Sequence, residues 1–475
     1  MTTLALREEV ALQRAPETVA RVERLCDPGS FEPLRTAVRS RHMGDRAGPG
    51  DGVVAGAGRV GGRPVFCYAQ DPSVLGGSLG VAHADSIVGV MRLAARAGAP
   101  VVGFVESGGA RLQEGHGALA GYGRIFRASV ELSSRAPQIS IVTGVSAGGG
   151  AYSPALTDFV VMTDEARMFL TGPQIVNEAL GERVSMEDLG GPRVHSRNGV
   201  CHLVAPDVAA ATSSARRLLA LLPQRFGDGP APLAPSAPPS GPAPDASVPA
   251  EPRRVYDVRD VARAVVDEES LLELSGAWAK NMVTALARIE GRPVGVLANQ
   301  PRNLGGVIDA VAAEKAAIFV DACDRFGLPL VVLVDTPGFM PGTRQEAGGV
   351  IRHGASLLRA FASARVPKVT VILRKAYGGA VITMNSRDLG ADVVFAWPQA
   401  EIGIMAARQA VGIVHRRDLA AAEQRDEALA ELASGYADEH LHAGAAAAAG
   451  FVDEVIEPAR TRNRLAWALA ALEQR

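Results

Sequence analysis

Two glycine-rich turns, one in each half of the chain, contain the residues whose types and spacing are best suited to catalysis. The first runs from Ser146 to Tyr152 and the second from Ala376 to Ala380. Each follows an apolar run and precedes a helical stretch, so backbone N–H groups should converge there and stabilise negative charge on an oxygen. Glycine lets a flat carbonyl approach the backbone. The pair predicts two oxyanion holes, although tight helix–strand packing would also explain the glycines.

Two other motifs favour structural interpretations. Gly56-Ala-Gly-Arg-Val-Gly61 fits the dinucleotide pattern GxGxxG, but a strand-like segment follows it, which predicts a β-hairpin turn. Gly144-Val-Ser-Ala-Gly148 fits a nucleophile elbow, yet no histidine is marked as its partner and the equivalent of Ser146 is Ala376. The histidines show no metal-ligand spacing and no P-loop occurs, so we expect no metal on this chain.

The chain is predicted to be a tandem duplication, because short segments recur at nearly constant spacing. The matches, at offsets of 229 or 230 residues, are Gly62–Val65 with Gly291–Val294, Leu75–Gly77 with Leu304–Gly306, Val101–Gly109 with Val331–Phe339, Pro137 with Pro367, and Gly148–Gly149 with Gly378–Gly379. Each half shows strands, glycine turns and helices in alternation, and the continuous apolar strands indicate a parallel sheet covered on both faces. The sequence therefore predicts two related α/β domains of repeated ββα units.

A proline-rich stretch divides the halves. Residues 229–252 contain nine of the chain's thirty prolines and no aromatic residue, which is typical of an extended linker. We therefore predict an N-terminal domain over residues 1–228 and a C-terminal domain over 253–475, consistent with a chain of 475 residues. The first fifty residues and the alanine-rich tail from Leu419 are interpreted as helical additions.

Composition excludes several functional classes. The formal net charge is −2, with neither a basic footprint for nucleic acid nor a polybasic membrane anchor. The longest apolar runs, such as Leu328–Val334, are too short to span a bilayer, and the N-terminus shows no signal-peptide pattern. Four cysteines are scattered singly, without a CxxC pair. We expect a cytoplasmic protein that binds neither nucleic acid nor membrane.

Longer motifs give the chain a family resemblance from about residue 20 to 470. They are Ser107-Gly-Gly-Ala-Arg-Leu-Gln-Glu-Gly115, Gly148-Gly-Gly-Ala-Tyr-Ser-Pro-Ala-Leu-Thr-Asp158, Phe169-Leu-Thr-Gly-Pro173, Val334-Asp-Thr-Pro-Gly338, Arg374-Lys-Ala-Tyr-Gly-Gly-Ala380 and Trp397-Pro-Gln-Ala-Glu401. The sequence resembles the carboxyltransferase (β) subunits of biotin-dependent acyl-CoA carboxylases, especially the acetyl-/propionyl-CoA carboxylase β chains of actinobacteria. The resemblance implies an α/β fold made of two crotonase-like domains.

The resemblance also implies a reaction and a site. Carboxylate would pass from N1′ of carboxybiotin to the α-carbon of an acyl-CoA. Gly148 and Gly149 would hold the thioester oxygen, and Gly379 and Ala380 the ureido oxygen of biotin. The freed biotin nitrogen would take the α-proton, so no protein base is required. Further contacts with CoA or biotin are expected from Ser107, Gly108, Gly109, Ala110, Arg111, Tyr152, Gly172, Pro173, Tyr377 and Gly378.

Substrate choice is expected to depend on Ile382, two positions after Ala380. In the family an acidic residue there goes with propionyl-CoA and an aliphatic one with acetyl-CoA or a broad range. The sequence therefore predicts conversion of acetyl-CoA to malonyl-CoA, for fatty-acid or polyketide synthesis, with propionyl-CoA carboxylation as a possible second activity. The alternative that Ile382 only packs stays open.

The resemblance implies partners as well. No Met-Lys-Met biotinylation site or ATP-binding loop occurs, so a biotin carboxylase/biotin carrier α subunit should bring the biotin and consume ATP. In the family the domains pair head to tail, which implies a dimer at least and usually a hexamer. The basic tail that often closes family members does not follow Arg475 in this sequence. A biotin-dependent acyl-CoA decarboxylase is the alternative, while an inactive scaffold or a standalone hydratase fits less well.

Overall fold

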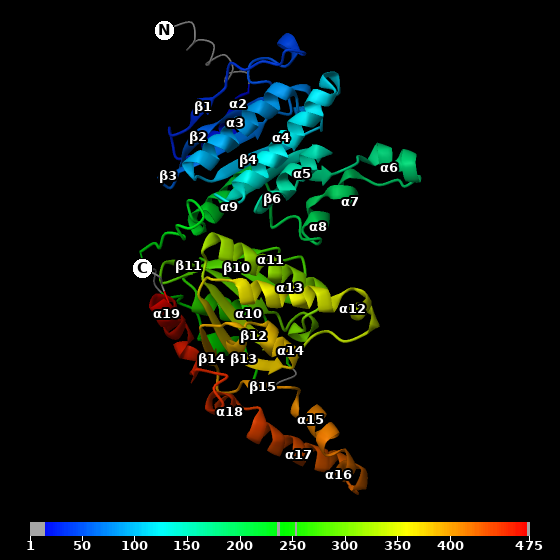
Figure 1. The fold of residues 1–475 in the computed structure, drawn as a ribbon, viewed down its shortest axis with the longest axis vertical. Helices are drawn as coiled ribbons and strands as arrows, with labels where there is room; N and C mark the ends of the chain where they lie inside the picture. Colours follow the sequence, from blue (N-terminus) through cyan, green and yellow to red (C-terminus); the bar gives the residue numbers. More distant parts are fainter. Residues whose placement is uncertain (1–14, 235–237, 252–253, 473–475) are drawn as a thin grey trace. The chain divides into compact units, whose positions relative to one another are not determined.

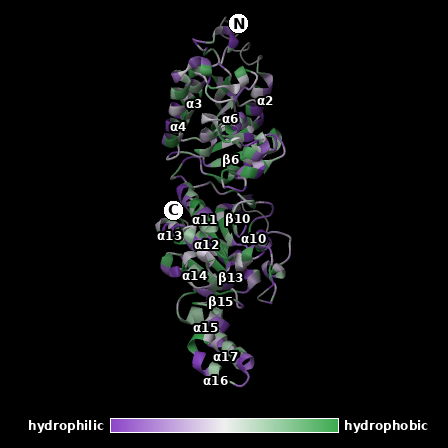
Figure 2. Ribbon diagram, turned by 90° about the vertical axis from the view of Figure 1, so that its right-hand side faces the viewer, coloured by the Kyte–Doolittle hydropathy of each residue, from purple (hydrophilic) through white to green (hydrophobic). Residues whose placement is uncertain are grey.

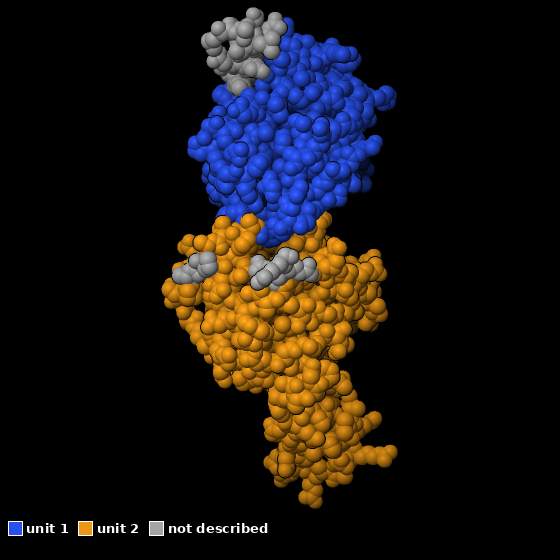
Figure 3. Space-filling view, turned by 60° about the vertical axis from the view of Figure 1, so that its left-hand side comes forward, with its two compact units in different colours: residues 1–230 blue, residues 231–475 orange. Residues whose placement is uncertain are grey.

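The computed structural model describes residues 15–234, 238–251 and 254–472. The chain divides into two compact units, unit 1 over residues 1–230 and unit 2 over 231–475 (Figure 3). Each unit is built on one eight-stranded mixed sheet with helices packed on its faces (Figure 1). The two α/β units confirm the predicted fold class.

The sheet of unit 1 has the order β1-β2-β3-β4-β5-β6-β8, with β7 paired to β5. Its first three strands are antiparallel and the others run parallel. The strands are β1 (Glu32–Leu34), β2 (Val53–Val60), β3 (Arg63–Gln70), β4 (Val101–Ser107), β5 (Gln138–Ala147), β6 (Phe159–Thr163), β7 (Arg167–Phe169) and β8 (Leu203–Ala205). The helices are α2 (Pro16–Leu25), α3 (Val81–Ala97), α4 (His116–Leu132), α5 (Gly149–Ala155), α6 (Pro173–Leu180), α7 (Met186–Gly190), α8 (Pro192–His195) and α9 (Val208–Leu221).

Unit 2 repeats this order as β9-β10-β11-β12-β13-β14-β16, with β15 paired to β13. The strands are β9 (Leu272–Leu274), β10 (Met282–Ile289), β11 (Arg292–Asn299), β12 (Leu330–Thr336), β13 (Lys368–Tyr377), β14 (Val393–Ala396), β15 (Glu401–Gly403) and β16 (Glu454–Val455). The helices are α10 (Val258–Val265), α11 (Ala310–Phe326), α12 (Thr343–Ala347), α13 (Val350–Ser363), α14 (Gly379–Thr383), α15 (Ala407–Val414), α16 (Arg416–Ala421), α17 (Arg425–His440), α18 (Ala443–Ala448) and α19 (Thr461–Leu472).

Local sequence signals explain the element boundaries. The long helices α3 and α11 both end at a left-handed glycine, Gly98 and Gly327, as their C-terminal glycines predict. The GxGxxG segment forms the β2–β3 hairpin, whose turn residues Gly61 and Gly62 both have positive φ. The central strands β12 and β13 are almost fully buried, and apolar residues gather along the strands of each unit (Figure 2).

The strand pairings correct one of the predicted internal matches. Phe66 pairs with Val101, and Gly295, which lies 229 residues after Phe66, pairs with Leu330. Val101 therefore corresponds to Leu330, and the predicted match of Val101 with Val331 was wrong by one residue. The apolar runs allow either register, and the pairing with the neighbouring strand decides between them. The extra residue of unit 2 lies between β12 and β13.

The terminal segments also belong to the repeated core. The pair α2 and β1 recurs in unit 2 as α10 and β9, and the last helix, α19, corresponds to α9 of unit 1. The interpretation of both ends as helical additions was therefore wrong for these elements. The spacing of the pair α2 and β1 from α10 and β9 differs from 229 because the loop between β1 and β2 is longer than the loop between β9 and β10.

The described part of the proline-rich stretch packs on unit 2. The backbone N–H of Leu233 donates to the carbonyl of Gly291 at 3.0 Å, and Pro244 is buried. The guanidinium of Arg374 donates to the carbonyls of Glu251 and Arg254. Residues 235–237 and 252–253 lie outside the described residues, and the boundaries at 228 and 253 stay predictions.

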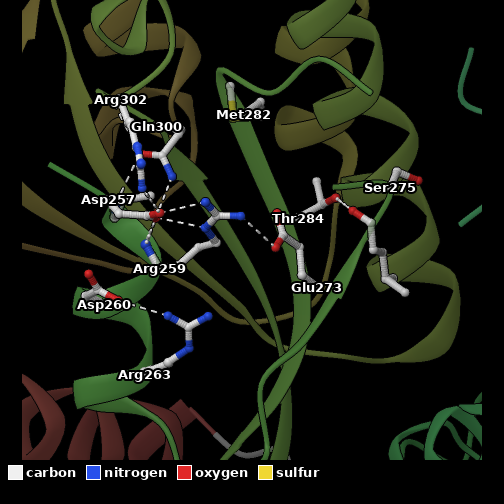
Figure 4. A network of polar contacts seen from close by, with 12 residues as sticks. Asp257, Arg259, Asp260, Arg263, Glu273, Ser275, Met282, Thr284, Gln300 and Arg302 are labelled. Carbon is white, nitrogen blue, oxygen red and sulfur yellow. Dashed lines mark hydrogen bonds and ion pairs between the residues drawn. The ribbon is translucent and has the colours of Figure 1, made fainter. Parts of the chain in front are cut away.

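A polar network secures helix α10 to the sheet of unit 2 (Figure 4). The carboxylate of Asp257 accepts hydrogen bonds from the backbone and side chain of Arg259 and from Gln300. Arg259 also bridges to Glu273 at 3.2 Å. The Arg259 side chain holds the pKa of Asp257 well below its usual range. Because its hydrogen bonds are directed to the helix start and the edge strand, we interpret this cluster as structural.

Both units contain an aspartate that binds the N–H groups of a hairpin turn and forms an ion pair with an arginine. Asp267 accepts the backbone N–H groups of Glu290 and Gly291 and pairs with Arg462 at 2.6 Å. Asp27 likewise accepts from the β2–β3 turn and pairs with Arg216 at 2.9 Å. The ion pair is nearly inaccessible in unit 2, with side-chain exposures of 10% for Arg462 and 2% for Asp267, but partly exposed in unit 1.

This difference in burial predicts unequal stability effects. Asp267→Ala should lower the free energy of unfolding by about 3–5 kcal/mol, because it leaves the Arg462 charge buried without its partner. Asp27→Ala should cost clearly less, because water can solvate Arg216. Urea unfolding of both full-length variants would measure this, and equal losses at the two positions would contradict it.

Candidate active site at two glycine turns

The first glycine turn lies at the end of β5. Gly148 has φ +59° and ψ −124°, a backbone conformation that glycine alone adopts without strain. Its N–H donates to the carbonyl of Phe169 on β7 at 3.0 Å, and its carbonyl accepts the N–H of Ala151. Among the described residues, no group accepts the N–H of Gly149 or Gly150. The turn therefore presents two adjacent free donors.

The second glycine turn has the same construction at the end of β13. Gly378 has φ +63°, and its N–H donates to the carbonyl of Gly403 on β15 at 2.9 Å. The N–H of Val381 donates to the carbonyl of Gly378. The N–H groups of Gly379 and Ala380 have no acceptor within the described part of the chain.

The comparison of the turns shifts one predicted pair. Gly379 and Ala380 are the open donors of the second turn, and their equivalents in unit 1 are Gly149 and Gly150. The sequence interpretation instead assigned Gly148 and Gly149 to the first oxygen. The N–H of Gly148 cannot serve, because Phe169 already accepts it. Gly149 and Gly150 are therefore the adjacent free donors of the first turn, and Gly148 supplies the backbone bend.

The two turns differ in what supports them. A Cβ at Gly149 would lie 2.7 Å from the ring of Tyr122 on α4, so this glycine packs directly on an aromatic face. The Tyr122 hydroxyl is 3.1 Å from the Oγ of Ser107, which donates to the carbonyl of Gly77. A Cβ at Gly379 would have Phe339 as its nearest neighbour, at 4.0 Å. The second turn is therefore the more open one.

Arg111 is buried in an ion-pair cluster. Its guanidinium pairs with Asp51 at 2.6 Å and with Glu114 at 2.9 Å, and the side chains of all three are at most 1% exposed. The two carboxylates also accept the N–H groups of His83 and Val81 at the start of α3. The contact of Arg111 with CoA or biotin stays a prediction, and the hydrogen bonds of its side chain are directed into the unit.

Burial shapes the pKa values in this cluster. Desolvation raises the pKa of Asp51, although the Arg111 guanidinium opposes the shift. Burial also raises the pKa of Glu114, but hydrogen bonds from Val81, Ser40 and Arg111 outweigh it and leave that pKa below its usual value. Burial and the nearby Arg111 lower the pKa of His83 to about 3. The charged cluster holds the segment from Gly108 to Gly115 against α3.

The other predicted contact residues of unit 1 form two groups, one at the end of β4 and one at α5 and α6. In the first group, Ser107 is buried and the N–H of Gly108 donates to the carbonyl of Gly76 at 2.9 Å. Gly109 has φ +98°, and Ala110 forms an isolated β-bridge with Leu79. These residues lie next to β5, since a Cβ at Gly109 would be 3.5 Å from the carbonyl of Ala147. Gly172 and Pro173 begin α6, which follows β7 directly. Tyr152 on α5 is 51% exposed, with its ring 6.1 Å from that of Phe126.

In unit 2 a cavity of about 740 Å³ adjoins the second turn. Gly378, Gly379 and Ile382 line it, together with residues that the sequence interpretation missed: Met384, Ile404, His440 and Phe451. Ile382 is 52% exposed. The missed residues follow the motif by up to about seventy positions, and no local pattern marks them. Tyr377 is 6% exposed, and its hydroxyl donates to the carboxylate of Glu401.

The nucleophile-elbow alternative finds no support. Ser146 is fully buried and its Oγ donates to the carbonyl of Gly150 at 2.8 Å. His195 contacts the carbonyl of Met168, and His202 accepts the N–H of Val160. Within the described residues no group of three or more His, Cys, Asp or Glu side chains could hold a metal ion. None of the helices described here combines the length and hydrophobicity needed to cross a bilayer.

Comparisons with known proteins find relatives that are similar over most of the chain. The methylmalonyl-CoA carboxyltransferase 12S subunit of Propionibacterium freudenreichii subsp. shermanii is 46% identical over 458 residues, covering 94% of this chain and 87% of that protein. The biotin-dependent acetyl-/propionyl-coenzyme A carboxylase beta5 subunit of Mycobacterium tuberculosis is 43% identical over 475 residues, covering 96% and 86%.

A solved structure is similar over the whole fold. The transcarboxylase 12S crystal structure, a hexamer with methylmalonyl-coenzyme A and methylmalonic acid bound, superposes with a TM-score of 0.94 at 43% identity, covering 99% of this chain and 95% of that one. The family model described as carboxyl transferase domain matches residues 17–475. Because this match spans both units and both glycine turns, the chain belongs to the carboxyl transferase domain family.

Proposed function

We propose that this chain is the carboxyltransferase subunit of a biotin-dependent acyl-CoA carboxylase, with acetyl-CoA as the preferred acceptor and propionyl-CoA as a second one. The observation that carries the proposal is the repeated glycine turn, with two adjacent free N–H groups in each unit. One turn suits the oxygen of a thioester and the other the oxygen of a second carbonyl that gains charge in the same reaction.

The residues present fit a biotin ring at the second turn. Gly379 lines a cavity of about 740 Å³ with many aliphatic residues in its lining, and the buried Ala380 follows it directly in the chain. Biotin carried on a partner subunit would bring the carboxylate and supply a nitrogen that accepts the α-proton. Gly379 and Ala380 would then hold its ureido oxygen, so the chain needs no general base of its own. Free cysteines throughout support the expected cytoplasmic location.

The first turn would stabilise the acceptor. The N–H groups of Gly149 and Gly150 would hold the thioester oxygen while the α-carbon takes on enolate character. Donors that are already oriented cost no reorganisation during the reaction, and each contributes about 3–4 kcal/mol to lowering a barrier of this kind. Ser107 and Tyr122 act behind the turn by supporting Gly149.

Substrate range and assembly are proposed from Ile382 and from the relatives. Ile382 presents an aliphatic side chain to the cavity on the biotin side, and the proposed head-to-tail pairing of protomers would bring the acyl group of the thioester against it. Such a wall discriminates one methylene by only about 1–3 kcal/mol. The relative named acetyl-/propionyl-coenzyme A carboxylase supports a range covering both substrates. The hexamer assembly of the 12S structure supports a hexameric oligomer. Head-to-tail pairing and an α partner that carries biotin are proposed from the sequence resemblance.

A second candidate function is the transfer of carboxylate from a carboxylated acyl donor to a different acyl acceptor, without the use of ATP. The 46% identity to a methylmalonyl-CoA carboxyltransferase favours it. Both functions use the same two turns, and the partner subunit distinguishes them. The biotin-dependent decarboxylase remains a third use of the same chemistry, with a membrane decarboxylase as partner.

The reverse half-reaction tests the proposal on the purified full-length chain. Incubation with biocytin and malonyl-CoA should release acetyl-CoA, with slower release of propionyl-CoA from methylmalonyl-CoA. Turnover that requires biocytin supports the carboxyltransferase assignment. A folded, oligomeric sample that stays inactive even when the α subunit is added would contradict it.

Gly379→Val should abolish transfer with little loss of stability. The new side chain has no neighbour closer than 4.0 Å at its Cβ, so it covers the N–H pair without a clash. Loss of such a donor should lower the rate about 100- to 1000-fold in the biocytin assay. Gly412→Val is the matched control, because no atom lies within 4 Å of a Cβ there. Equal activity of the two variants would contradict the role of the second turn.

Ile382→Ala should shift the acyl preference. Shortening the wall makes room for one more methylene, so the rate with methylmalonyl-CoA relative to malonyl-CoA should rise about tenfold. Ile413→Ala, which truncates an isoleucine on α15 with 66% exposure, serves as the control. An unchanged ratio in Ile382→Ala would mean that this side chain only packs.

A further inference from the structure

The second turn is secured by an interaction that the first turn lacks. Tyr377 is the last residue of β13 and directly precedes the turn, and its hydroxyl donates to the carboxylate of Glu401 on β15. Burial raises the pKa of the Tyr377 hydroxyl, so it remains a proton donor at neutral pH.

Strand β15 carries the other half of the turn. The carbonyl of Gly403 accepts the N–H of Gly378, which fixes the start of the turn. This strand is only three residues long, and the segment α15–α18 follows it. The N–H of Ile402 donates to the carbonyl of Leu441, so β15 is also attached to the C-terminal end of α17. Any displacement of β15 would therefore move the acceptor that holds Gly378.

In unit 1, other residues support the corresponding glycine turn. The equivalents of Tyr377 and Glu401 are Ala147 and Arg167, which cannot form this hydrogen bond. Arg167 instead pairs with Glu187 on α7 at 2.8 Å and donates to two nearby carbonyls. The first turn rests on the Tyr122 ring, whereas the second turn has no atom closer than 4.0 Å to the Cβ position of Gly379.

We propose that Tyr377 and Glu401 form a positioning pair for the second glycine turn, which fixes β15 against β13 and so orients the N–H groups of Gly379 and Ala380 toward the ureido oxygen of biotin. The pair touches neither substrate in this role and acts through the turn. The inference rests on the proposed function, and it adds two residues to the biotin side of the reaction without affecting the acyl-CoA side.

The test compares kinetic constants for the two substrates in the reverse half-reaction. Tyr377→Phe and Glu401→Ala should each raise the KM for biocytin about tenfold, the loss typical of a hydrogen bond to a charged group. The KM for malonyl-CoA should stay within about twofold, since unit 1 has its own supports. Glu401→Gln keeps an acceptor oxygen and should restore most of the wild-type biocytin KM.

Asp260→Asn is the matched control, because it also converts a carboxylate of unit 2 to an amide but in an exposed pair with Arg263. Amide hydrogen exchange on the same proteins gives a readout independent of turnover: exchange at residues 378–383 should accelerate in Tyr377→Phe and Glu401→Ala and not in the control.

The outcomes separate this inference from the proposed function. A wild-type chain with no biocytin-dependent turnover overturns the proposed function and this inference with it. An active wild-type chain whose variants keep the biocytin KM overturns the positioning pair alone. A rise in the malonyl-CoA KM equal to that for biocytin, or a Glu401→Gln variant as impaired as Glu401→Ala, also overturns it.

Discussion

The candidate site depends on one backbone constraint, which is used twice. An inner strand of each sheet is followed directly by a glycine with positive φ, and the N–H of that glycine is held by the carbonyl of a short parallel strand. The bend directs the next two N–H groups away from the sheet. These groups lie in the first turn of the following helix, where no intrahelical acceptor is available to them. The pair of free donors is thus a consequence of chain direction, and only glycine tolerates the bend without strain.

Around this constraint the two units have diverged. Unit 1 supports its turn with the Tyr122 ring and holds the adjoining loop with the buried Asp51–Arg111–Glu114 cluster. Unit 2 leaves its turn open beside a large cavity and uses Tyr377 and Glu401 at its edge. A duplicated fold with different supports suits a reaction in which two different carbonyls gain charge. The two units keep equivalent ion pairs at positions that contribute only to stability, namely Asp27–Arg216 and Asp267–Arg462.

Residues that carry function and residues that hold the fold are easily confused in such a chain. Arg111 lies in a motif typical of ligand contact, yet two buried carboxylates and the carbonyl of Ser78 occupy its donors. The polar network around Asp257 contains more charged groups than either turn, but its hydrogen bonds cap α10 and join it to β9. The glycine turns are poor in side chains, and their chemistry lies in the backbone. Burial and hydrogen-bond partners therefore distinguish the two classes better than residue type does.

The sequence by itself determined the duplication, the α/β class, the hairpin at Gly61 and Gly62, and the place of both glycine turns, because these follow from short-range periodicity and from the conformational freedom of glycine. Only the tertiary structure decided that Val101 corresponds to Leu330, that Gly148 has its N–H occupied, that Arg111 is buried and that Phe451 reaches the cavity. Each of these depends on a partner distant in the chain: a neighbouring strand, the carbonyl of Phe169, the carboxylate of Asp51 or the segment after α18. A hydrogen bond uses up a donor wherever its acceptor comes from, and the linear pattern does not contain that information.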